Sequence, residues 1–182
     1  HVHCFEPGAY TFRMLSENVK IIENVTLNNT GLGKERGSSA LYYNEAGAGI
    51  ASLTKRRLDH FNIDFTESET VTIDTLDNYC KTNRISGIDL LKIDVEGHEL
   101  DVLSSGANGV FRDKIIRLVS FEFGGCNIDT RTFFQDFFYF FKDADMDLFR
   151  ITPSGYLFPV PSYREIYEQF RTTNFLAIRN DL

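Results

Sequence analysis

The stretch IDLLKIDVEGHEL, at residues 88–100, decides the fold class of this chain. Its first half is a nearly continuous apolar run, which is typical of a strand in the middle of a parallel sheet, covered on both faces. Its second half passes through charged residues and a glycine into a helical pattern. A buried strand that turns directly into a helix predicts an α/β domain with acidic groups at one edge of its sheet.

Strands and helices alternate along most of the chain. We expect strands at residues 2–5, 21–28, 88–95, 115–123, 147–152 and 174–179, and helices after residue 8 and at residues 75–83, 99–105 and 132–141. Parallel neighbours need crossover helices, so the alternation predicts a mostly parallel sheet with helices on both faces. Residues 38–75 differ, because their extended patterns predict a β-hairpin excursion with a mobile basic loop at residues 55–65.

Length and composition indicate one domain, residues 1–182, since 42% hydrophobic residues suffice for a substantial core. The formal net charge of -7 argues against nucleic acid as a partner. The basic run at residues 55–57 is expected to be a solvated face. No long apolar run predicts a membrane span, and three cysteines without ligand spacing predict a cytoplasmic protein without a disulfide framework.

One expected helix, residues 132–141, is rich in phenylalanine. It holds too many aromatic side chains for a single buried stripe. Core packing explains most of them, because aromatic rings bury large areas and contact one another in offset arrangements. An excess on the outer face would instead indicate a partner surface.

Acidic and amide residues follow several of the expected strands. They are Glu6, Asn29, residues 94–96 and Glu122. In open α/β sheets, ligands bind beyond the carboxyl ends of the strands, so these residues are expected at one edge. Glu6 also precedes a helix, where its two oxygens can accept hydrogen bonds from two ribose hydroxyls or can interact with the helix dipole.

Titratable groups gather where the strand at residues 88–95 ends. Period two sends Lys92 and Asp94 to the same face, while Glu96 and His98 lie in the following turn. Such groups shift one another's pKa values and are typical of functional sites, although a structural ion-pair network has the same sequence. For His98, a role at the start of the helix stays open beside catalysis.

Four groups of residues resemble the FkbM family of S-adenosylmethionine-dependent methyltransferases. They are Phe5-Glu6-Pro7, residues 29–33 (NTGLG), residues 89–100 (DLLKIDVEGHEL) with residues 103–107 (LSSGA), and residues 174–179 (NFLAIR). The resemblance covers nearly the whole chain, and KIDVEGHE is its most specific part. It implies a class I methyltransferase (Rossmann-like) fold and O-methylation of a hydroxyl on a sugar or natural-product-like small molecule.

The resemblance also implies which residues contact the cofactor, S-adenosylmethionine. Glu6 falls on the ribose, with Pro7 beside it, and Asn29 and Thr30 fall where a loop approaches the adenine. Asp94 falls beside the transferring methyl group. A first strand and a glycine-rich loop of the D-x-G-A-N-x-G kind are implied ahead of Phe5-Glu6-Pro7, and we expect both to be missing from the fold.

The catalytic candidates are Asp94, Glu96 and His98, any of which could take the proton of the acceptor hydroxyl. The resemblance does not settle which of them is the base. A metal site is the weaker option, and none is assigned: the oxygen ligands of Asp94, Glu96 and Glu122 suit Mg²⁺, but nothing in the sequence fixes their geometry.

Two other functions stay open. The chain could be a truncated, non-catalytic module that binds a partner through its phenylalanine-rich helix. A nicotinamide dehydrogenase is weaker, because its fingerprint glycines are absent. For an enzyme, the expected partners are a small-molecule hydroxyl acceptor and, as a further option, a second copy in a homodimer, with no nucleic acid and no membrane.

Overall fold

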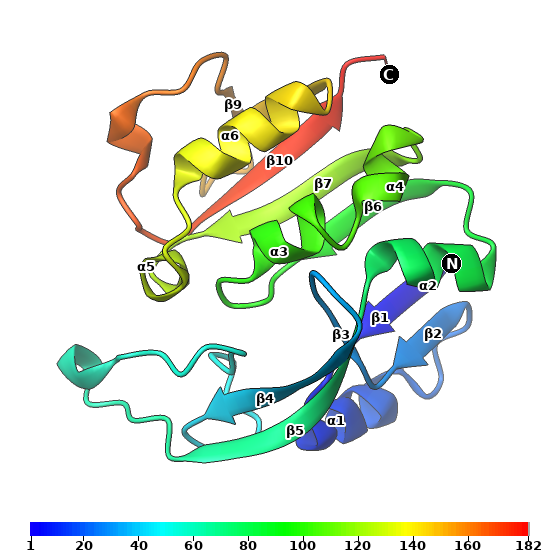
Figure 1. The fold of residues 1–182 in the computed structure, drawn as a ribbon, viewed down its shortest axis with the longest axis vertical. Coiled ribbons are helices and arrows are strands. Elements are labelled where there is room, and N and C mark those ends of the chain that lie inside the picture. The colour runs from blue at the N-terminus through cyan, green and yellow to red at the C-terminus, as the bar shows by residue number, and fades with distance from the viewer. Residues whose placement is uncertain (182) are drawn as a thin grey trace.

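A computed structural model describes residues 1–181. Their strands form three sheets, shown in Figure 1. The strands are β1 Val2–Phe5, β2 Val25–Asn28, β3 Gly31–Leu32, β4 Gly37–Tyr43, β5 Glu67–Asp74, β6 Ile88–Ile93, β7 Ile116–Phe123, β8 Met146–Ile151, β9 Leu157–Pro159 and β10 Thr173–Arg179. The α-helices are α1 Ala9–Val19, α2 Leu76–Asn83, α3 Glu99–Ser104, α4 Asn108–Arg112, α5 Cys126–Thr130 and α6 Phe134–Asp143.

The largest sheet has the strand order β6-β7-β10-β8-β9. Only β6 and β7 are parallel in it, and its other neighbours are antiparallel. β1 pairs with β2 in parallel, while β5 lies between β3, which is parallel to it, and β4, which is antiparallel. The antiparallel pair β4–β5 lies almost wholly within residues 38–75, the segment expected to form a β-hairpin excursion.

The prediction of one mostly parallel sheet is therefore wrong, although the alternation of strands and helices is present. The cause lies in the last third of the chain. Helix α6 carries the chain from β7 to β8 as a crossover, but residues 160–172 then return without an α-helix. Strand β10 consequently enters between β7 and β8 in the opposite direction.

Helices cover one face of the large sheet rather than both. Figure 1 shows α3, α4 and α6 on the same side of it. Along β7, Val119, Phe121 and Phe123 are buried on that side, whereas the alternate residues Leu118 and Ser120 are only half-buried. The expectation of β6 as a central, doubly covered strand is also wrong, because β6 forms an edge of the sheet.

The phenylalanine-rich helix packs mainly into the core, as predicted. Phe137 of α6 is fully buried and stacks on Phe121 of β7 with a centroid separation of 4.8 Å. Phe121 also stacks on Phe141 and on Phe175 of β10, at 5.2 and 5.5 Å. Rings from one helix and two strands thus form a continuous aromatic layer beneath α6.

Two segments differ from the sequence predictions. Strand β2 begins only at Val25, and Ile21, expected to lie in it, is 86% exposed. The basic loop at residues 55–65, expected to be mobile, is anchored by the buried side chains of Leu58 and Phe65. No helix within residues 1–181 is long and apolar enough to cross a bilayer.

Replacing Phe137 with alanine is expected to lower the free energy of unfolding by about 3 to 5 kcal/mol, since it removes a buried ring from the aromatic layer. The control is Tyr139→Ala on the same helix, whose side chain is 45% exposed and whose loss should cost about 1 kcal/mol. Urea unfolding followed by circular dichroism measures both values. Equal losses would show that the aromatic layer is not the core.

Candidate functional site

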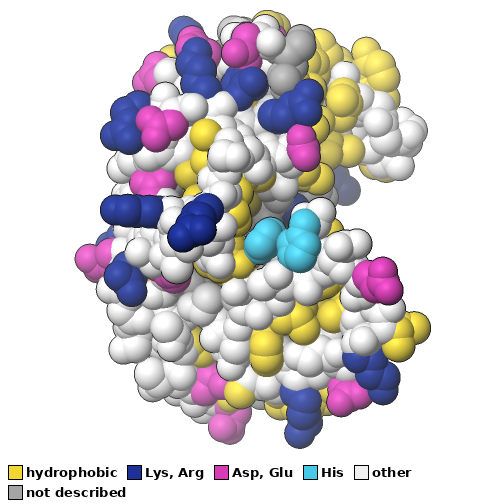
Figure 2. Space-filling model, turned by 90° about the vertical axis from the view of Figure 1, so that its right-hand side faces the viewer, with side chains coloured by type: hydrophobic (Ala, Val, Ile, Leu, Met, Phe, Trp, Pro, Cys, Tyr) yellow, Lys and Arg dark blue, Asp and Glu magenta, His cyan; other side chains and the backbone are white. Residues whose placement is uncertain are grey.

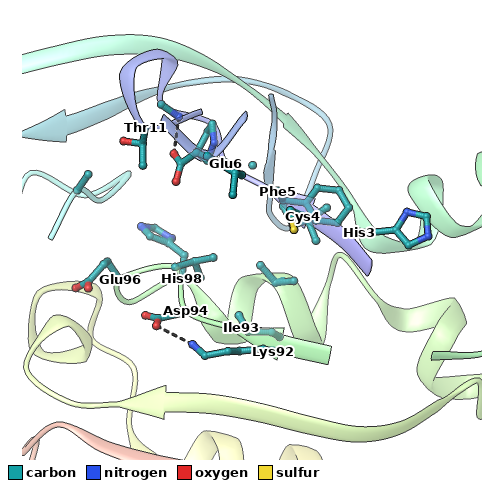
Figure 3. A pocket seen from close by; sticks show the side chains of 18 of the residues that line it. His3, Cys4, Phe5, Glu6, Thr11, Lys92, Ile93, Asp94, Glu96 and His98 are labelled. Atoms are coloured by element: carbon teal, nitrogen blue, oxygen red, sulfur yellow. Dashed lines mark hydrogen bonds and ion pairs between the residues drawn. The ribbon is translucent and has the colours of Figure 1, made fainter. Parts of the chain in front are cut away.

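A cavity of about 1360 Å³ lies between β1 and β6. Figure 2 shows the hollow on the surface, with hydrophobic and histidine side chains beside it. At the carboxyl end of both strands, Glu6 lies on one wall, and Asp94, Glu96 and His98 lie on the opposite wall (Figure 3). The structure thus brings four of the predicted site residues together.

The turn from β6 into α3 is held from inside by a buried carboxylate. Glu99 is 1% exposed, and its Oε1 accepts the backbone N–H groups of Val95 and Gly97 at 3.1 and 3.2 Å. Burial raises the pKa of Glu99. Because both hydrogen bonds fall within the turn, Glu99 fixes the backbone that carries the side chains of Asp94, Glu96 and His98.

The same turn contains two residues with left-handed backbone angles, Glu96 with φ 52° and Gly97 with φ 105°. A β-carbon at Gly97 would lie 2.9 Å from Thr130 Cγ2 and 3.0 Å from the carbonyl oxygen of Cys126, so only glycine fits. At Glu96, a non-glycine residue in this region is strained by roughly 1 to 3 kcal/mol. The fold tolerates this strain at the point where the Glu96 carboxylate enters the cavity.

Arg56 links this turn to the loop that follows β4. Its Nη1 donates to Glu96 Oε2 at 2.8 Å and its Nε donates to Asp129 Oδ2 at 3.2 Å. The Arg56 side chain is only 10% exposed. The prediction of a solvated face for residues 55–57 is therefore wrong for Arg56, but it holds for Arg57, whose side chain is 88% exposed.

Glu96 is set up to exchange a proton near neutral pH. Burial raises its pKa to about 7, even though Arg56 opposes the shift, and the nearby Asp94 and Glu122 add to it. Within residues 1–181 its Oε2 is paired with Arg56, while its Oε1 has no hydrogen-bond partner. The unpaired oxygen is available to accept a proton from a bound molecule.

His98 belongs to a hydrogen-bonded chain. Its Nδ1 lies 2.8 Å from Asp101 Oδ2 and its Nε2 lies 3.0 Å from Thr54 Oγ1. Because Asp101 accepts at Nδ1, a neutral His98 carries its proton there, and Nε2 accepts from the Thr54 hydroxyl. The bond to His98 lowers the pKa of Asp101. To act as a base, His98 would first have to release Thr54.

Glu6 faces this cluster from the other wall. Its Oε1 accepts the Gly8 N–H at 2.8 Å, and Glu69 accepts the neighbouring Ala9 N–H at 3.1 Å, so two carboxylates cap helix α1. Burial and the nearby Glu69 raise the pKa of Glu6. Its second oxygen has no partner in the described chain. One oxygen of the Glu6 carboxylate thus caps helix α1, and the other oxygen is available to a ligand.

Asp94, on the acidic wall, accepts a hydrogen bond at its Oδ2 from Lys92 Nζ at 2.8 Å. Of the remaining predicted residues, Pro7 lines the cavity. Asn29 and Thr30 do not line it. Asn29 donates instead to the carbonyl oxygens of Glu6 and Pro7, at 2.9 and 3.1 Å. Thr30 donates to the carbonyl of Thr72 at 2.9 Å, so both side chains brace the backbone.

Sequence reasoning missed Ser52, Thr54 and Arg56, which come from the excursion and contact the 96–98 turn. The Ser52 hydroxyl donates to the Glu96 carbonyl at 2.8 Å. No motif marks these residues, because their partners lie some forty positions away. Glu122, noted as a strand-end acid, lines the cavity, and burial raises its pKa. Residues 1–181 contain no cluster of His, Cys, Asp and Glu suited to a metal ion.

A family comparison bears directly on this cavity. Residues 1–149 match the model of the methyltransferase FkbM domain, and this span includes every residue of the site. The chain belongs to the FkbM methyltransferase family. No curated protein and no solved structure matched the chain.

Membership in the FkbM family identifies the activity class as methyl transfer and confirms the resemblance found in the sequence. The family match also covers both walls of the cavity, since the matched residues include β1 and the β6–α3 turn. In this FkbM domain the acidic wall comes from β6 and β7, and the opposite wall comes from β1 and the excursion.

We expect Arg56→Met to lower the free energy of unfolding by about 3 kcal/mol at neutral pH, because Glu96 and Asp129 then lose their common partner. The pKa of Glu96, already raised to about 7, should rise further. Protonation then relieves its unpaired charge, so the loss should be smaller at roughly pH 5 than at roughly pH 8.

Arg57→Met is the matched control, and its effect should stay within about 0.5 kcal/mol at either pH. Chemical denaturation at the two pH values gives all four free energies. Equal effects of the Arg56 and Arg57 substitutions would mean that the buried ion pairs do not stabilise the turn.

Proposed function

We propose that the chain is an S-adenosylmethionine-dependent O-methyltransferase that acts on a hydroxyl of a sugar or natural-product-like small molecule. The observation that carries the proposal is Glu96, a carboxylate with a pKa of about 7 and an unpaired oxygen, across the cavity from Glu6. A hydroxyl is a weak acid, and a base tuned near the working pH accelerates its attack by about 10² to 10⁴.

The cavity lining suits the cofactor in two respects. The unpartnered oxygen of Glu6 can accept hydrogen bonds from ribose hydroxyls while Oε1 keeps its bond to Gly8. Beside it, Leu41 and Ile73 supply apolar surface of the kind that receives an adenine ring. When bound, S-adenosylmethionine supplies an electrophilic methyl group.

The residues of the acidic wall then have distinct tasks. Asp94 and Glu122 contribute negative charge, which favours a cationic cofactor and keeps the Glu96 pKa high. Glu96 Oε1 receives the proton of the acceptor hydroxyl, while Arg56 holds Oε2. His98, engaged by Asp101 and Thr54, stiffens the turn. Positioning of the two reactants at ~3 to 3.5 Å supplies most of the remaining acceleration.

The direct test combines binding with transfer. Calorimetry should detect binding of S-adenosylmethionine to the chain. At a cofactor concentration a hundredfold above Kd, the free energy of unfolding should rise by about 2.7 kcal/mol. Incubation with methyl-labelled cofactor and a panel of monosaccharides, polyols and hydroxylated aromatics should place label on oxygen. Label found only on nitrogen, or no binding of the cofactor, would contradict the proposal.

Glu6→Gln is expected to weaken S-adenosylmethionine binding by about tenfold or more, because it removes the charge and one acceptor oxygen. Glu69→Gln is the control, since Glu69 caps the same helix through Ala9. That variant should bind within about twofold of the wild type, a difference well under 1 kcal/mol. Equal losses in both variants would assign Glu6 to helix capping alone.

With an acceptor identified by the panel, kcat/KM should rise with pH through an apparent pKa of about 7, because Glu96 must be ionised to accept a proton. Glu96→Gln should flatten this limb and lower kcat by about 10² or more. Arg56→Met should move the limb to higher pH. An unchanged profile in Glu96→Gln would remove Glu96 from the proton transfer.

A further inference from the structure

A second hollow lies on the other face of the large sheet. It is a groove of about 140 Å³ where β7 ends and β10 begins. Glu122 of β7 lines the large cavity, whereas the next residue, Phe123, lines the groove. Because neighbouring residues of a strand point to opposite faces, the groove and the candidate methyl-transfer site are separated by the sheet.

The floor of the groove consists of buried aromatic rings. Phe123 and Phe175 are 2% and 3% exposed. Phe134 of α6 packs on Phe175 and on Tyr167, with centroid separations of 4.7 and 5.4 Å. In Figure 1, residues 160–172, in orange, pass beside the first turn of α6 and the start of β10. This segment supplies the rim above the aromatic floor.

A strained residue gives the rim its shape. Phe170 has φ 49°, in the left-handed region that bulky side chains rarely adopt. Its ring packs on Phe123 with a centroid separation of 5.2 Å. The residues on either side of it, Gln169 and Arg171, line the groove. The turn at Phe170 thus places an apolar ring on the core and two polar side chains at the rim.

The polar lining of the groove carries positive charge. Arg150 of β8, Gln169, Arg171 and Thr173 line it, and no Asp or Glu does so within residues 1–181. In that part of the chain neither guanidinium group has an ion pair or a hydrogen bond, whereas Arg56 is held by two carboxylates. Both positive charges at the groove are therefore available to a ligand.

The carboxylate nearest to Arg171 along the chain is already engaged elsewhere. The two oxygens of Glu168 accept the N–H groups of Phe134 and Gln135 at 2.8 and 2.9 Å. Tyr163 also donates its hydroxyl to Glu168, at 3.0 Å. Glu168 thus caps the first turn of α6 and leaves the charge of the groove uncompensated.

The size and the surroundings of the groove indicate the kind of ligand. Pockets that enclose a whole small molecule usually measure roughly 300 to 1000 Å³, so a groove of 140 Å³ suits one group of a ligand. Guanidinium groups match the paired oxygens of a carboxylate or a phosphate. Ile166, which lines the groove, is 58% exposed, and Phe158, opposite Arg150 on β9, is 50% exposed. These side chains offer apolar surface to the rest of the ligand.

We propose that the groove binds the carboxylate or phosphate group of an amphipathic small molecule. Arg150 and Arg171 hold the oxygens of this group, and the amide of Gln169 adds a donor. The apolar part of the ligand lies on Ile166 and Phe158. This site does not depend on the proposed methyl transfer, because the groove lies on the opposite face of the sheet.

The test is an amide chemical-shift titration with phenyl phosphate and with benzoate, without any adenosyl ligand. At least one of them should shift the amides of Gln169, Arg171 and Thr173 saturably, with a Kd of about 1 mM or lower. The anion that binds more tightly identifies the preferred group. Absence of saturable shifts at these amides with both anions would overturn the proposal.

Two further probes separate charge from apolar contact. Benzyl alcohol, which has the ring without the charge, should bind at least about tenfold more weakly than the preferred anion. Methyl phosphate, which has the charge without the ring, should bind several-fold more weakly than phenyl phosphate. Equal affinity of benzyl alcohol would overturn the role of the arginines. Equal affinity of methyl phosphate would overturn the contact with Ile166 and Phe158.

Variants of the exposed arginines provide the second measurement. Arg150→Met and Arg171→Met should each weaken binding of the preferred anion by about tenfold or more. Arg150→Lys keeps the charge without the planar fork, so its affinity should fall between those of the wild type and Arg150→Met. Arg84→Met removes the same charge outside the groove and should stay within about twofold of the wild type.

An Arg84→Met loss as large as the other two would assign the effect to net charge and overturn the site. Equal affinities of Arg150→Lys and Arg150→Met would remove the Arg150 charge from the binding. Because no cofactor or methyl acceptor is present in these titrations, their failure is distinct from a failure of the proposed methyl transfer.

Discussion

A guanidinium enclosed by protein is stable only when carboxylates surround it, and the site depends on this condition at Arg56. Its bonds to Glu96 and Asp129 tie the loop after β4 to the turn after β6 and to α5. Ser52 and Thr54 add hydrogen bonds from the same loop. The excursion from the α/β pattern therefore forms part of the cavity wall and holds Glu96 in its strained conformation. Removal of one charge from such a group costs more than the pair contributes, because the other charge is left buried without a partner.

The environments in and around the site shift the pKa values of its carboxylates in opposite directions. Burial and like charges raise the pKa values of Glu96 and Glu122, whereas the hydrogen bond from His98 lowers that of Asp101. Titratable groups whose environments push their pKa values apart can divide roles, one exchanging protons and one remaining charged. Under the proposed function, the first role falls to Glu96 and the second to Asp101, which orients His98.

The sequence predicted the local elements well, because caps and periodicity are local. Helix α2 begins after Thr75, whose hydroxyl accepts the Asn78 N–H, within one residue of the start predicted at residue 75. The sequence did not predict the strand directions of the large sheet. The direction of β10 depends on residues 160–172, which carry no helical or hairpin signal. The carboxylates of the site were found from strand ends. Arg56 was not found, because a run of basic residues looks the same in the sequence whether it is solvated or enclosed by carboxylates that lie far away along the chain.

The central claim is that the acidic turn after β6 and Glu6 on the opposite wall form one methyl-transfer site. The most direct measurement is a crystal structure of the chain grown with S-adenosylhomocysteine. We expect density in the cavity between β1 and β6, with the ribose hydroxyls at the free oxygen of Glu6 and the sulfur facing Asp94 and Glu96. A ligand bound elsewhere, or one whose sulfur points away from the acidic wall, would contradict the central claim.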